Sequence, residues 1–448
     1  MVTVMEVAMK FYDRKKELHI LNRIYAQCEE EYGAITVLTG RRRVGKTMLS
    51  REYAKDKTQL YFFTSKKTEP LLCAELKEEY EKLTGEELIG EIKSFPKLFE
   101  QLLKFGIDNP YVLIIDEFQE FNSINKSVYS DIQNIWDEYK FKTKVHVIFI
   151  GSIYSMMIDI FQNSKEPLYG RADRILYIKP FEVKIIKEIL KDNNAYSKES
   201  LFYNYLITGG VPRYQEILVR EKCYDLQDIL DLILEKDSFF IGEGRNLLIQ
   251  EFGKEYGVYF SILEMISIGR TSRSEIESIF EKSIGGYLEK LEIEYDVIEK
   301  VKPVGSKKNG KIQKYRIKDN FIKFWFRYIY KNIRLIEDER FELVRKIIEK
   351  DISTYSGLIL EKLFLAIKKD NPDYGLIGTY WERGNQNEID IVAINEIDKI
   401  VKISEVKMNK DKINISKLKE KSEKLILKYK EYEFEYEGLS LDDIDKML

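Results

Sequence analysis

The sequence predicts an α/β protein whose N-terminal part is a doubly wound parallel sheet, and three observations favour this fold class. A β-branched run, residues 36–39, ends at a glycine that opens the pattern G-x-x-x-x-G-K-T. A second apolar run, residues 111–115, is typical of a strand covered on both faces. Strand-like segments alternate with segments of helical periodicity up to about residue 178, as they do in parallel sheets.

The glycine-containing segment has the pattern of a phosphate-binding P-loop. Its residues are Gly40, Arg41, Arg42, Arg43, Val44, Gly45, Lys46 and Thr47, and Met48 follows them in the expected nucleotide site. The two glycines permit backbone angles that let successive N–H groups face an anion. In this pattern Lys46 reaches the β- and γ-phosphates and the Thr47 hydroxyl holds Mg²⁺. The following helix, from about residue 45 to residue 55, points its positive N-terminus at the same phosphates.

The run at residues 111–115 ends in two carboxylates, Asp116 and Glu117. Asp116 is expected at the sheet edge where ligands bind, supporting Mg²⁺ through its water shell. Glu117 is placed to polarise an attacking water molecule. Downstream of a P-loop, this pair indicates ATP hydrolysis.

Two further positions suit an ATPase, and each has a structural alternative. Ser152 follows a predicted strand, residues 145–150, where it senses the γ-phosphate, caps the next helix, or does both. Arg171 or Arg174 either neutralises charge in the transition state or forms a surface salt bridge.

Composition excludes some classes of protein. The chain has 448 residues with 73 basic and 76 acidic side chains, so the net charge of -3 predicts no partner by itself. Three scattered cysteines and two histidines show no zinc-site spacing and fit a reducing, cytoplasmic location. The N-terminus does not resemble a signal peptide, and no apolar stretch is long enough to span a membrane.

The order of elements predicts four domains. The remaining elements expected up to residue 180 are helices near 18–25, 69–83, 95–105 and 125–139, and strands at 60–63 and 175–178. Pro180 and Phe181 are expected to start a helical lid that contains a rigid turn at residues 208–214. The predicted domains are an ATPase core at 8–180, the lid at 181–250, a winged helix at 251–335 and a nuclease-like α/β domain at 340–448.

The order of short motifs resembles one family. The motifs are F-x-x-R-x-x-E-L from Phe11, the P-loop, I-I-D-E-F-Q, G-S at Gly151, P-L-Y-G-R and G-G-V-P-R-Y. Together they resemble the archaeal-type P-loop ATPase family, which is related to AAA+ and STAND ATPases, over about residues 8–235. The resemblance implies that Lys46, Thr47, Asp116 and Glu117 bind and hydrolyse ATP with Mg²⁺. It also implies a sensor-like Ser152 and makes Arg171 the candidate arginine finger.

The winged helix is predicted from three helices near 256–266, 272–280 and 283–291 and two strands at 295–299 and 314–318. A basic loop lies between the strands and contains Lys302, Lys307, Lys308 and Lys311. Such a module either contacts phosphates of double-stranded DNA or regulates the ATPase within the chain. The third helix is poor in base-reading side chains, so both alternatives stay open.

The last domain carries a second candidate chemistry on a predicted hairpin. If Asn395–Asp398 form its turn, Asp390 pairs near Ile403 and Glu405 is its diagonal neighbour, close enough to share a metal ion. Lys407 lies on the same face and could orient a water molecule or offset phosphate charge. The alternative is alternating charge on a solvated edge strand.

This arrangement resembles the PD-(D/E)XK nuclease core, in which Asp390 and Glu405-Val406-Lys407 follow a helix containing Glu361. The resemblance implies a metal-dependent DNA endonuclease with Asp390 and Glu405 as metal ligands, although the motif also occurs in inactive relatives. We therefore expect an ATPase that couples Mg-ATP hydrolysis to a DNA-interacting module. The alternatives are an ATP-dependent switch with an inactive nuclease-like domain, and a STAND-like scaffold that forms homo-oligomers on ATP.

Overall fold

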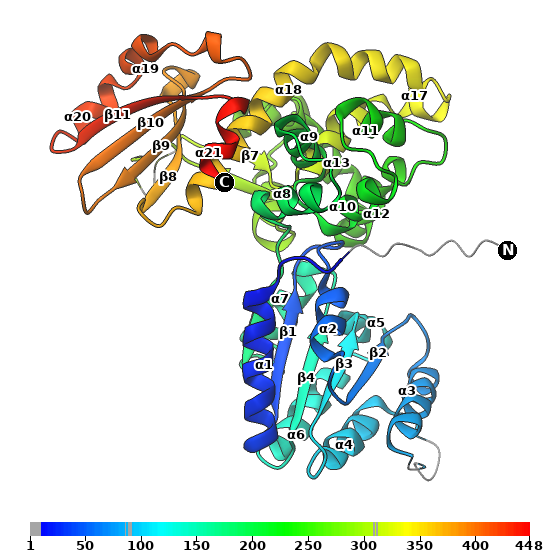
Figure 1. Cartoon of the computed structure of the whole chain (residues 1–448). Helices are drawn as coiled ribbons and strands as arrows, with labels where there is room; N and C mark the ends of the chain where they lie inside the picture. The colour runs from blue at the N-terminus through cyan, green and yellow to red at the C-terminus, as the bar shows by residue number, and fades with distance from the viewer. Residues whose placement is uncertain (1–9, 86, 88–91, 308–309, 311) are drawn as a thin grey trace. The chain divides into compact units, whose positions relative to one another are not determined.

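The computed structural model describes residues 10–85, 87, 92–307, 310 and 312–448. They form two compact units, which we call the N-terminal unit (Lys10–Pro180) and the C-terminal unit (Phe181–Leu448). Figure 1 shows the helices and strands of both.

The N-terminal unit is built on the expected parallel sheet. Its five strands are β1 (Ala34–Thr39), β2 (Gln59–Phe63), β3 (Tyr111–Asp116), β4 (Val145–Ile150) and β5 (Arg174–Tyr177). They pair in the order β2-β3-β4-β1-β5, and every pairing is parallel. Strands β1, β3 and β4 are buried along their whole length, which explains their continuous apolar sequences.

Helices cover both faces of this sheet (Figure 1). They are α1 (Lys15–Glu30), α2 (Lys46–Ala54), α3 (Glu69–Thr84), α4 (Phe95–Phe105), α5 (Phe121–Ile124), α6 (Val128–Tyr139) and α7 (Tyr154–Gln162), with a 3₁₀ turn η1 (Phe118–Glu120). Helices α1 and α2 share a core with Ile114 and Ile148, whereas α3, α4, α6 and α7 pack against Leu113 and Phe149. Because all five strands run parallel, their carboxyl ends lie at the same end of the sheet.

Two expected helix starts in this region are wrong. Helix α6 begins at Val128 rather than Asn125, because Asn125 is extended and separates it from α5. No helix starts at Pro180, because Glu182 is extended and the next helix begins at Val183.

The C-terminal unit opens with five helices. They are α8 (Val183–Asp192), α9 (Lys198–Thr208), α10 (Pro212–Arg220), α11 (Leu226–Ile233) and α12 (Phe239–Phe252), followed by a 3₁₀ turn η2 (Gly253–Glu255). The turn between α9 and α10 requires Gly210, whose φ is +83° and whose added Cβ would lie 2.1 Å from the Phe181 carbonyl oxygen.

Three helices and a two-stranded antiparallel sheet come next. They are α13 (Tyr256–Ser267), α14 (Arg273–Phe280), α15 (Gly285–Glu289) with a π-helical turn η3 (Lys290–Glu294), β6 (Ile298–Val301) and β7 (Lys314–Ile317). Strand β6 starts later than the expected residue 295, because Asp296 adopts a left-handed turn with φ 53°. Lys308 and Lys311 of the expected basic loop lie outside the described residues.

The chain ends in a second sheet. The elements leading to it are α16 (Asn320–Phe324), η4 (Trp325–Ile329), η5 (Tyr330–Asn332), α17 (Ile333–Glu337) and the long α18 (Phe341–Lys369). The sheet and its connections are β8 (Leu376–Tyr380), η6 (Arg383–Asn385), β9 (Ile389–Asn395), β10 (Ile400–Val406), η7 (Lys410–Lys412), α19 (Ile415–Lys421), α20 (Glu423–Lys428), β11 (Glu433–Leu439), η8 (Leu441–Asp443) and α21 (Ile444–Met447). The strand order is β11-β10-β9-β8, with β11 parallel to β10 and the other pairs antiparallel.

The two faces of this second sheet pack against different helices. Ile391 and Val406 share a core with Leu360 of α18. Val392 and Ile403 share another with Leu418 and Leu425 of α19 and α20. The sheet therefore lies between α18 and the pair α19–α20 (Figure 1).

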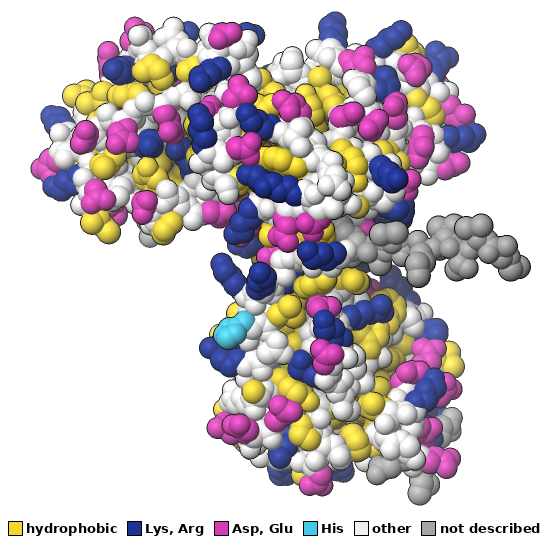
Figure 2. Space-filling model, in the orientation of Figure 1, with side chains coloured by type: hydrophobic (Ala, Val, Ile, Leu, Met, Phe, Trp, Pro, Cys, Tyr) yellow, Lys and Arg dark blue, Asp and Glu magenta, His cyan; other side chains and the backbone are white. Residues whose placement is uncertain are grey.

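Figure 2 shows Lys and Arg interspersed with Asp and Glu on the face in view. This mixture agrees with the near-neutral composition of 73 basic and 76 acidic residues. Among the described residues no helix has both the length and the apolar character needed to cross a membrane.

Candidate functional site

The P-loop connects the end of β1 to the start of α2. Gly40 and Gly45 have φ values of +135° and +87°, and an added Cβ on Gly40 would lie 2.4 Å from the Ile178 carbonyl oxygen. A glycine is therefore required at position 40 both for its backbone angle and for its contact with the neighbouring chain. The first N–H groups of α2 have no partner within the helix and are available to an anion.

Lys46, the first residue of α2, folds back over this loop. Its ammonium donates hydrogen bonds to the carbonyl oxygens of Gly40 at 2.7 Å and Arg41 at 2.9 Å. The Lys46 side chain is buried, so its charge lies against the loop and not in bulk solvent. A phosphate cradled by the loop would be within reach of the same ammonium.

Asp116 joins the P-loop to the end of β3. Its Oδ2 accepts hydrogen bonds from the Thr47 hydroxyl at 2.7 Å and the Tyr61 hydroxyl at 2.9 Å, and its Oδ1 accepts from the Glu117 amide at 2.8 Å. Burial raises the pKa of Asp116, while the hydrogen bonds from Thr47 and Tyr61 act in the opposite direction. A hydroxyl beside a carboxylate offers the hard oxygen donors that Mg²⁺ prefers, so these residues fit that ion.

Glu117 is held in an uncommon conformation by its neighbours. Its φ is +55°, and its Oε2 accepts hydrogen bonds from the Ser152 hydroxyl at 2.7 Å and from the Gln119 side-chain amide. Helix α7 is capped by Ile153, so Ser152 does not occupy the cap position. The Ser152 hydroxyl therefore contacts the Glu117 carboxylate and does not cap the helix.

The two candidate arginine fingers make other contacts. Arg171 forms a two-point interaction with Asp137, at 2.9 Å and 3.3 Å, and donates to the Tyr169 carbonyl oxygen at 3.0 Å. Arg174 is exposed and donates to the Asp173 carbonyl oxygen. Within the described residues neither guanidinium contacts the P-loop, so a role for Arg171 in catalysis stays a prediction.

Sequence reasoning did not assign Arg14, which the structure links to the P-loop. Its side chain is buried, and its Nη2 donates to the carbonyl oxygens of Val44 at 3.1 Å and Lys179 at 2.7 Å. One guanidinium thus ties the loop to the segment that follows β5. The arginine of F-x-x-R was visible in the sequence, but nothing local indicated these partners.

Two hydroxyl groups near Asp116 were also missed. The Thr64 amide donates to the Asp116 carbonyl oxygen at 2.9 Å. The Thr64 and Ser65 hydroxyls are buried and have no hydrogen-bond partner among the described residues. Both residues directly follow β2, whose carboxyl end lies beside that of β3. Their position after a predicted strand was the sequence signal that could have indicated them.

In the C-terminal sheet, the hairpin of β9 and β10 has a different register from the expected one. Asn395 pairs with Ile400 and Ile391 with Ser404, so the next position places Asp390 opposite Glu405, not near Ile403. The turn has the expected four residues but lies one residue further along the chain, at 396–399, and the Asn395 side chain before it accepts hydrogen bonds from the amides of residues 397 and 398. This register makes Asp390 and Glu405 direct cross-strand neighbours on one face of the sheet.

Lys407 lies between these carboxylates. Its ammonium is 3.3 Å from Asp390 Oδ2 and 3.6 Å from Glu405 Oε1. Asp390 also accepts from the Val406 amide at 2.7 Å, and Glu405 from the Asn414 amide at 2.7 Å. Asp390, Glu405 and Lys407 therefore lie together, and we call them the carboxylate–lysine cluster.

Glu361 of α18 lies close enough to interact electrostatically with this cluster. Burial, and then the charge of Asp390, raise the pKa of Glu361, while Lys407 and Arg316 act to lower it. Burial also raises the pKa of Asp390, and Lys407 opposes that effect.

No group of three or more His, Cys, Asp and Glu side chains suited to a metal ion occurs in the described parts of the chain. A cation at Asp390 and Glu405 would have to complete its coordination with water, backbone oxygen or substrate, as Mg²⁺ often does.

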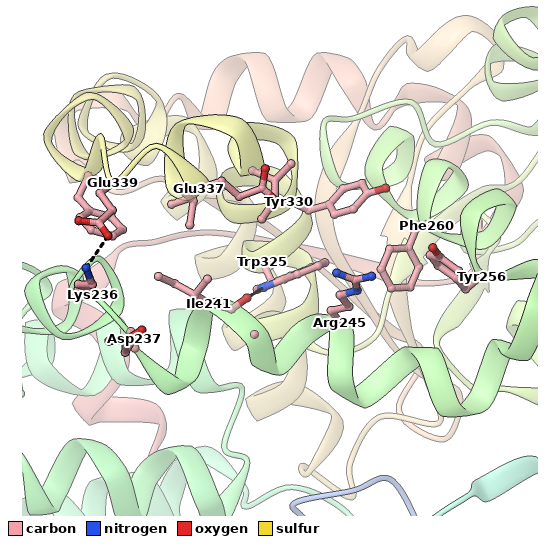
Figure 3. Close-up of a pocket in the computed structure, with 15 residues that line it drawn as sticks. Lys236, Asp237, Ile241, Arg245, Tyr256, Phe260, Trp325, Tyr330, Glu337 and Glu339 are labelled. Carbon is pink, nitrogen blue, oxygen red and sulfur yellow. Dashed lines mark hydrogen bonds and ion pairs between the residues drawn. The ribbon is translucent and has the colours of Figure 1, made fainter.

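The C-terminal unit also contains a cavity of about 710 Å³ between α12, α13 and the η4–α17 segment (Figure 3). Its walls combine aromatic side chains, Tyr256, Phe260, Trp325 and Tyr330 among them, with charged ones such as Arg245. An ion pair between Lys236 and Glu339, 2.7 Å apart, lies at its border. No residue of the carboxylate–lysine cluster lines it.

Comparison with known families matches two parts of the chain. Residues 11–218 match an ATPase domain found predominantly in Archaea. Residues 325–426 match a domain of archaeal and bacterial proteins of unknown function. The second match covers α18 and most of the C-terminal sheet.

Similar proteins extend over most of the chain. The uncharacterized protein MJECL04 of Methanocaldococcus jannaschii is 31% identical over 420 residues, which are 89% of this chain and 87% of that protein. The Walker-type ATPase PABY2304 of Pyrococcus abyssi superposes with a TM-score of 0.56 at 19% identity, over 71% of this chain and 96% of that one. The ORC2 protein of Aeropyrum pernix, solved as ADPNP–ADP complexes, gives a TM-score of 0.52 at 13% identity, over 75% and 97%. The two structures establish a shared fold.

Proposed function

Because this chain belongs to the ATPase family found predominantly in Archaea, we propose that its N-terminal unit binds ATP with Mg²⁺ and hydrolyses it. The observation that carries the proposal is the 2.7 Å hydrogen bond between the Thr47 hydroxyl and Asp116, which joins the P-loop to the end of β3. It brings a Mg²⁺ ligand and an acidic partner for the ion's water shell together.

In the proposed reaction each residue has a distinct task. The loop amides and Lys46 hold the β- and γ-phosphates, and Thr47 and Asp116 hold Mg²⁺, which neutralises developing charge when bound. Glu117 orients and polarises the attacking water, and Ser152 keeps the Glu117 carboxylate in place through its 2.7 Å hydrogen bond.

ATP turnover of the Lys46→Ala variant tests this proposal. Removing the ammonium is expected to lower turnover by about 100-fold or more, because the phosphates lose their charged partner. Lys97→Ala, which changes an exposed lysine of the same unit, is the matched control and should turn over normally. Unchanged turnover in Lys46→Ala would overturn the proposal.

We further propose that the C-terminal unit interacts with double-stranded DNA through a winged helix and a nuclease-like domain. The winged helix is supported by the order α13, α14, α15 and the β6–β7 hairpin. The nuclease-like domain is supported by a helix, three antiparallel strands and a final parallel strand, with Asp390, Glu405 and Lys407 converging on one face. Two carboxylates and a lysine are the groups a metal-dependent phosphodiesterase requires.

Cleavage of plasmid and linear DNA with Mg²⁺ or Mn²⁺, with and without ATP, tests this second proposal. Cleavage that is lost in Asp390→Ala and kept in Asp373→Ala, an exposed aspartate of the same domain, would support an ATP-regulated nuclease. DNA-stimulated ATP hydrolysis without cleavage would instead support an ATP-dependent switch with an inactive nuclease-like domain. Failure to bind any duplex, at every salt concentration, would favour a STAND-like scaffold that forms homo-oligomers on ATP.

A further inference from the structure

Three cations of the C-terminal unit gather where β7, α16 and α18 meet. They are Arg316, Lys323 and Lys362, and we call them the cation cluster. The Lys362 ammonium donates to the Lys318 carbonyl oxygen and, at 2.6 Å, to the Asn320 side chain. Lys323 is one helical turn beyond Asn320 on α16, and Arg316 is two residues before Lys318. The hydrogen bonds of Lys362 therefore fix the junction from which the other two cations project.

Lys323 reaches the same junction through a ring contact, and the charge of Arg316 acts on both Lys323 and Lys362. The Lys323 ammonium lies 5.6 Å from the centre of the Tyr355 ring. Tyr355 precedes Lys362 by two turns of α18, so the two side chains lie on one face of that helix. Among the described residues, the Arg316 guanidinium donates one hydrogen bond, a long one of 3.5 Å to the Thr379 hydroxyl.

Within the part of the chain that the structure describes, the cation cluster has no carboxylate partner. Each of its side chains is half-buried, and no carboxylate of the described residues lies within the 4.0 Å of an ion pair. The neighbouring Arg327, in contrast, is held by Asp351 at 2.6 Å and 2.9 Å. The cluster therefore differs from an ordinary buried ion pair.

The acidic residues that act on the cation cluster from a distance are Glu299, Asp319 and Glu361. They do not neutralise it: burial, followed by the charges of Lys362 and Arg316, lowers the pKa of Lys323 to about 7. Burial likewise lowers the pKa of Lys362 to about 8. Asp319 accepts a hydrogen bond from the Ile322 amide at the start of α16, which directs its carboxylate to the helix.

We propose that the cation cluster is a binding site for a phosphate group. Half-buried positive charges that have no carboxylate partner among the described residues are costly, and a phosphate oxyanion would compensate them with several charge-assisted hydrogen bonds. A guanidinium beside two ammonium groups suits the tetrahedral oxygens of phosphate better than it suits one carboxylate. The site needs neither ATP hydrolysis nor DNA cleavage, so it goes beyond both functions proposed above.

The proposed phosphate site lies close to the carboxylate–lysine cluster. Glu361 interacts electrostatically with both Arg316 and Lys323. It also interacts with Asp390 and Lys407 of the carboxylate–lysine cluster. A phosphate held here would lie near that cluster on its α18 side. The phosphate could belong to a nucleic-acid backbone or to a free phosphate compound, and the experiment separates the two sources.

The test is calorimetric titration of the full chain with inorganic phosphate. All proteins carry Lys46→Ala, so that the P-loop contributes as little as possible. Arg316→Gln and Lys323→Gln are expected to weaken phosphate binding by about tenfold or more, the effect of losing one charge-assisted hydrogen bond. Lys350→Gln, an exposed lysine on α18, should leave binding unchanged, and Arg316→Lys should retain most of it.

Thermal unfolding separates binding from a structural role. Without phosphate, Lys323→Gln should melt no lower than the parent, because it removes a half-buried charge that has no carboxylate partner among the described residues. With phosphate, only the parent should gain stability. Lower melting of the variant without phosphate, or no phosphate binding by the parent, would overturn the proposal.

A labelled DNA duplex then identifies the source of the phosphate. If the backbone occupies the site, Arg316→Gln should weaken duplex binding and reduce its salt dependence by about one counterion. If a free phosphate compound occupies it, the variant should lose phosphate binding and keep its affinity for the duplex. Both outcomes support the site.

Discussion

At the scale of single residues, the nucleotide site is held together by side chains that bond to one another. Asp116 accepts from Thr47 and Tyr61, and Glu117 accepts from Ser152 and Gln119. Such contacts fix the carboxylates before a nucleotide arrives, so less reorganisation is needed during the reaction. Each donor can therefore affect catalysis without contacting ATP.

The Ser152→Ala variant tests whether the orientation of the Glu117 carboxylate affects catalysis. The variant loses the 2.7 Å hydrogen bond that orients the carboxylate, so kcat is expected to fall by roughly tenfold while ATP affinity stays unchanged. Steady-state ATPase assays and nucleotide titrations measure the two quantities. Ser123→Ala, an exposed serine of the same unit, is the control. A Ser152→Ala enzyme with normal kcat would show that Glu117 needs no such support.

The buried His146 ring is expected to make the stability of the N-terminal unit depend on pH. Its ring is fully buried between the Thr36 and Tyr53 hydroxyls, at 2.8 Å and 2.7 Å, and burial lowers its pKa to about 3. Because the folded-state pKa lies below the unfolded value of about 6.5, His146 contributes stability above pH 6.5 that is lost as pH falls towards 3.

Urea unfolding at several pH values measures this contribution. The His146→Gln variant is expected to be destabilised at pH 7, and its difference from wild type should shrink by up to about 1.4 kcal/mol per pH unit below pH 6.5. His19→Gln, at an exposed position, is the control. A constant difference between pH 7 and pH 4 would contradict the assignment of a buried neutral ring.

At the scale of elements, the P-loop depends on the strand beside it. Gly40 is confined by the Ile178 carbonyl oxygen, which follows β5, and Arg14 bonds to the carbonyl oxygen of Lys179 in the same segment. The loop conformation is therefore determined by β1 together with the end of β5.

Gly40→Ala tests this dependence. The added Cβ would approach Ile178 to 2.4 Å at a φ of +135°, so nucleotide binding should be lost and the N-terminal unit destabilised by about 2 kcal/mol or more. Gly170→Ala is the matched control, because Gly170 has a φ of +72° but no atom within 4 Å of the added Cβ. Nucleotide titration and thermal melting compare the two. Equal behaviour would show that only the backbone angle matters.

The elements also show what the sequence could and could not predict. The parallel sheet was predictable because buried strands are continuous apolar runs, and the P-loop because its pattern is local. The predicted hairpin register was wrong because the turn lies at residues 396–399, where the Asn395 side chain bonds to the turn amides, and periodicity does not report such a contact. Arg14 and the cation cluster were missed because their partners lie far away in sequence.

At the scale of the whole molecule, each unit has its own hydrophobic cores. The clusters around the parallel sheet consist of residues 21–178, and those of the C-terminal unit of residues 183–444. A unit with its own core can unfold cooperatively, so two thermal transitions are expected in calorimetry. Nucleotide binding provides a way to assign them.

A ligand that binds only the folded N-terminal unit stabilises that unit by mass action. ADP with Mg²⁺ at about 100 times its dissociation constant should add about 2.7 kcal/mol and raise one transition by roughly 5–10 °C, leaving the other in place. The Lys46→Ala variant should lose this shift, and Lys97→Ala should keep it. If both transitions moved together, the two units would be thermodynamically coupled, and nucleotide binding would then be transmitted to the carboxylate–lysine cluster through their shared stability.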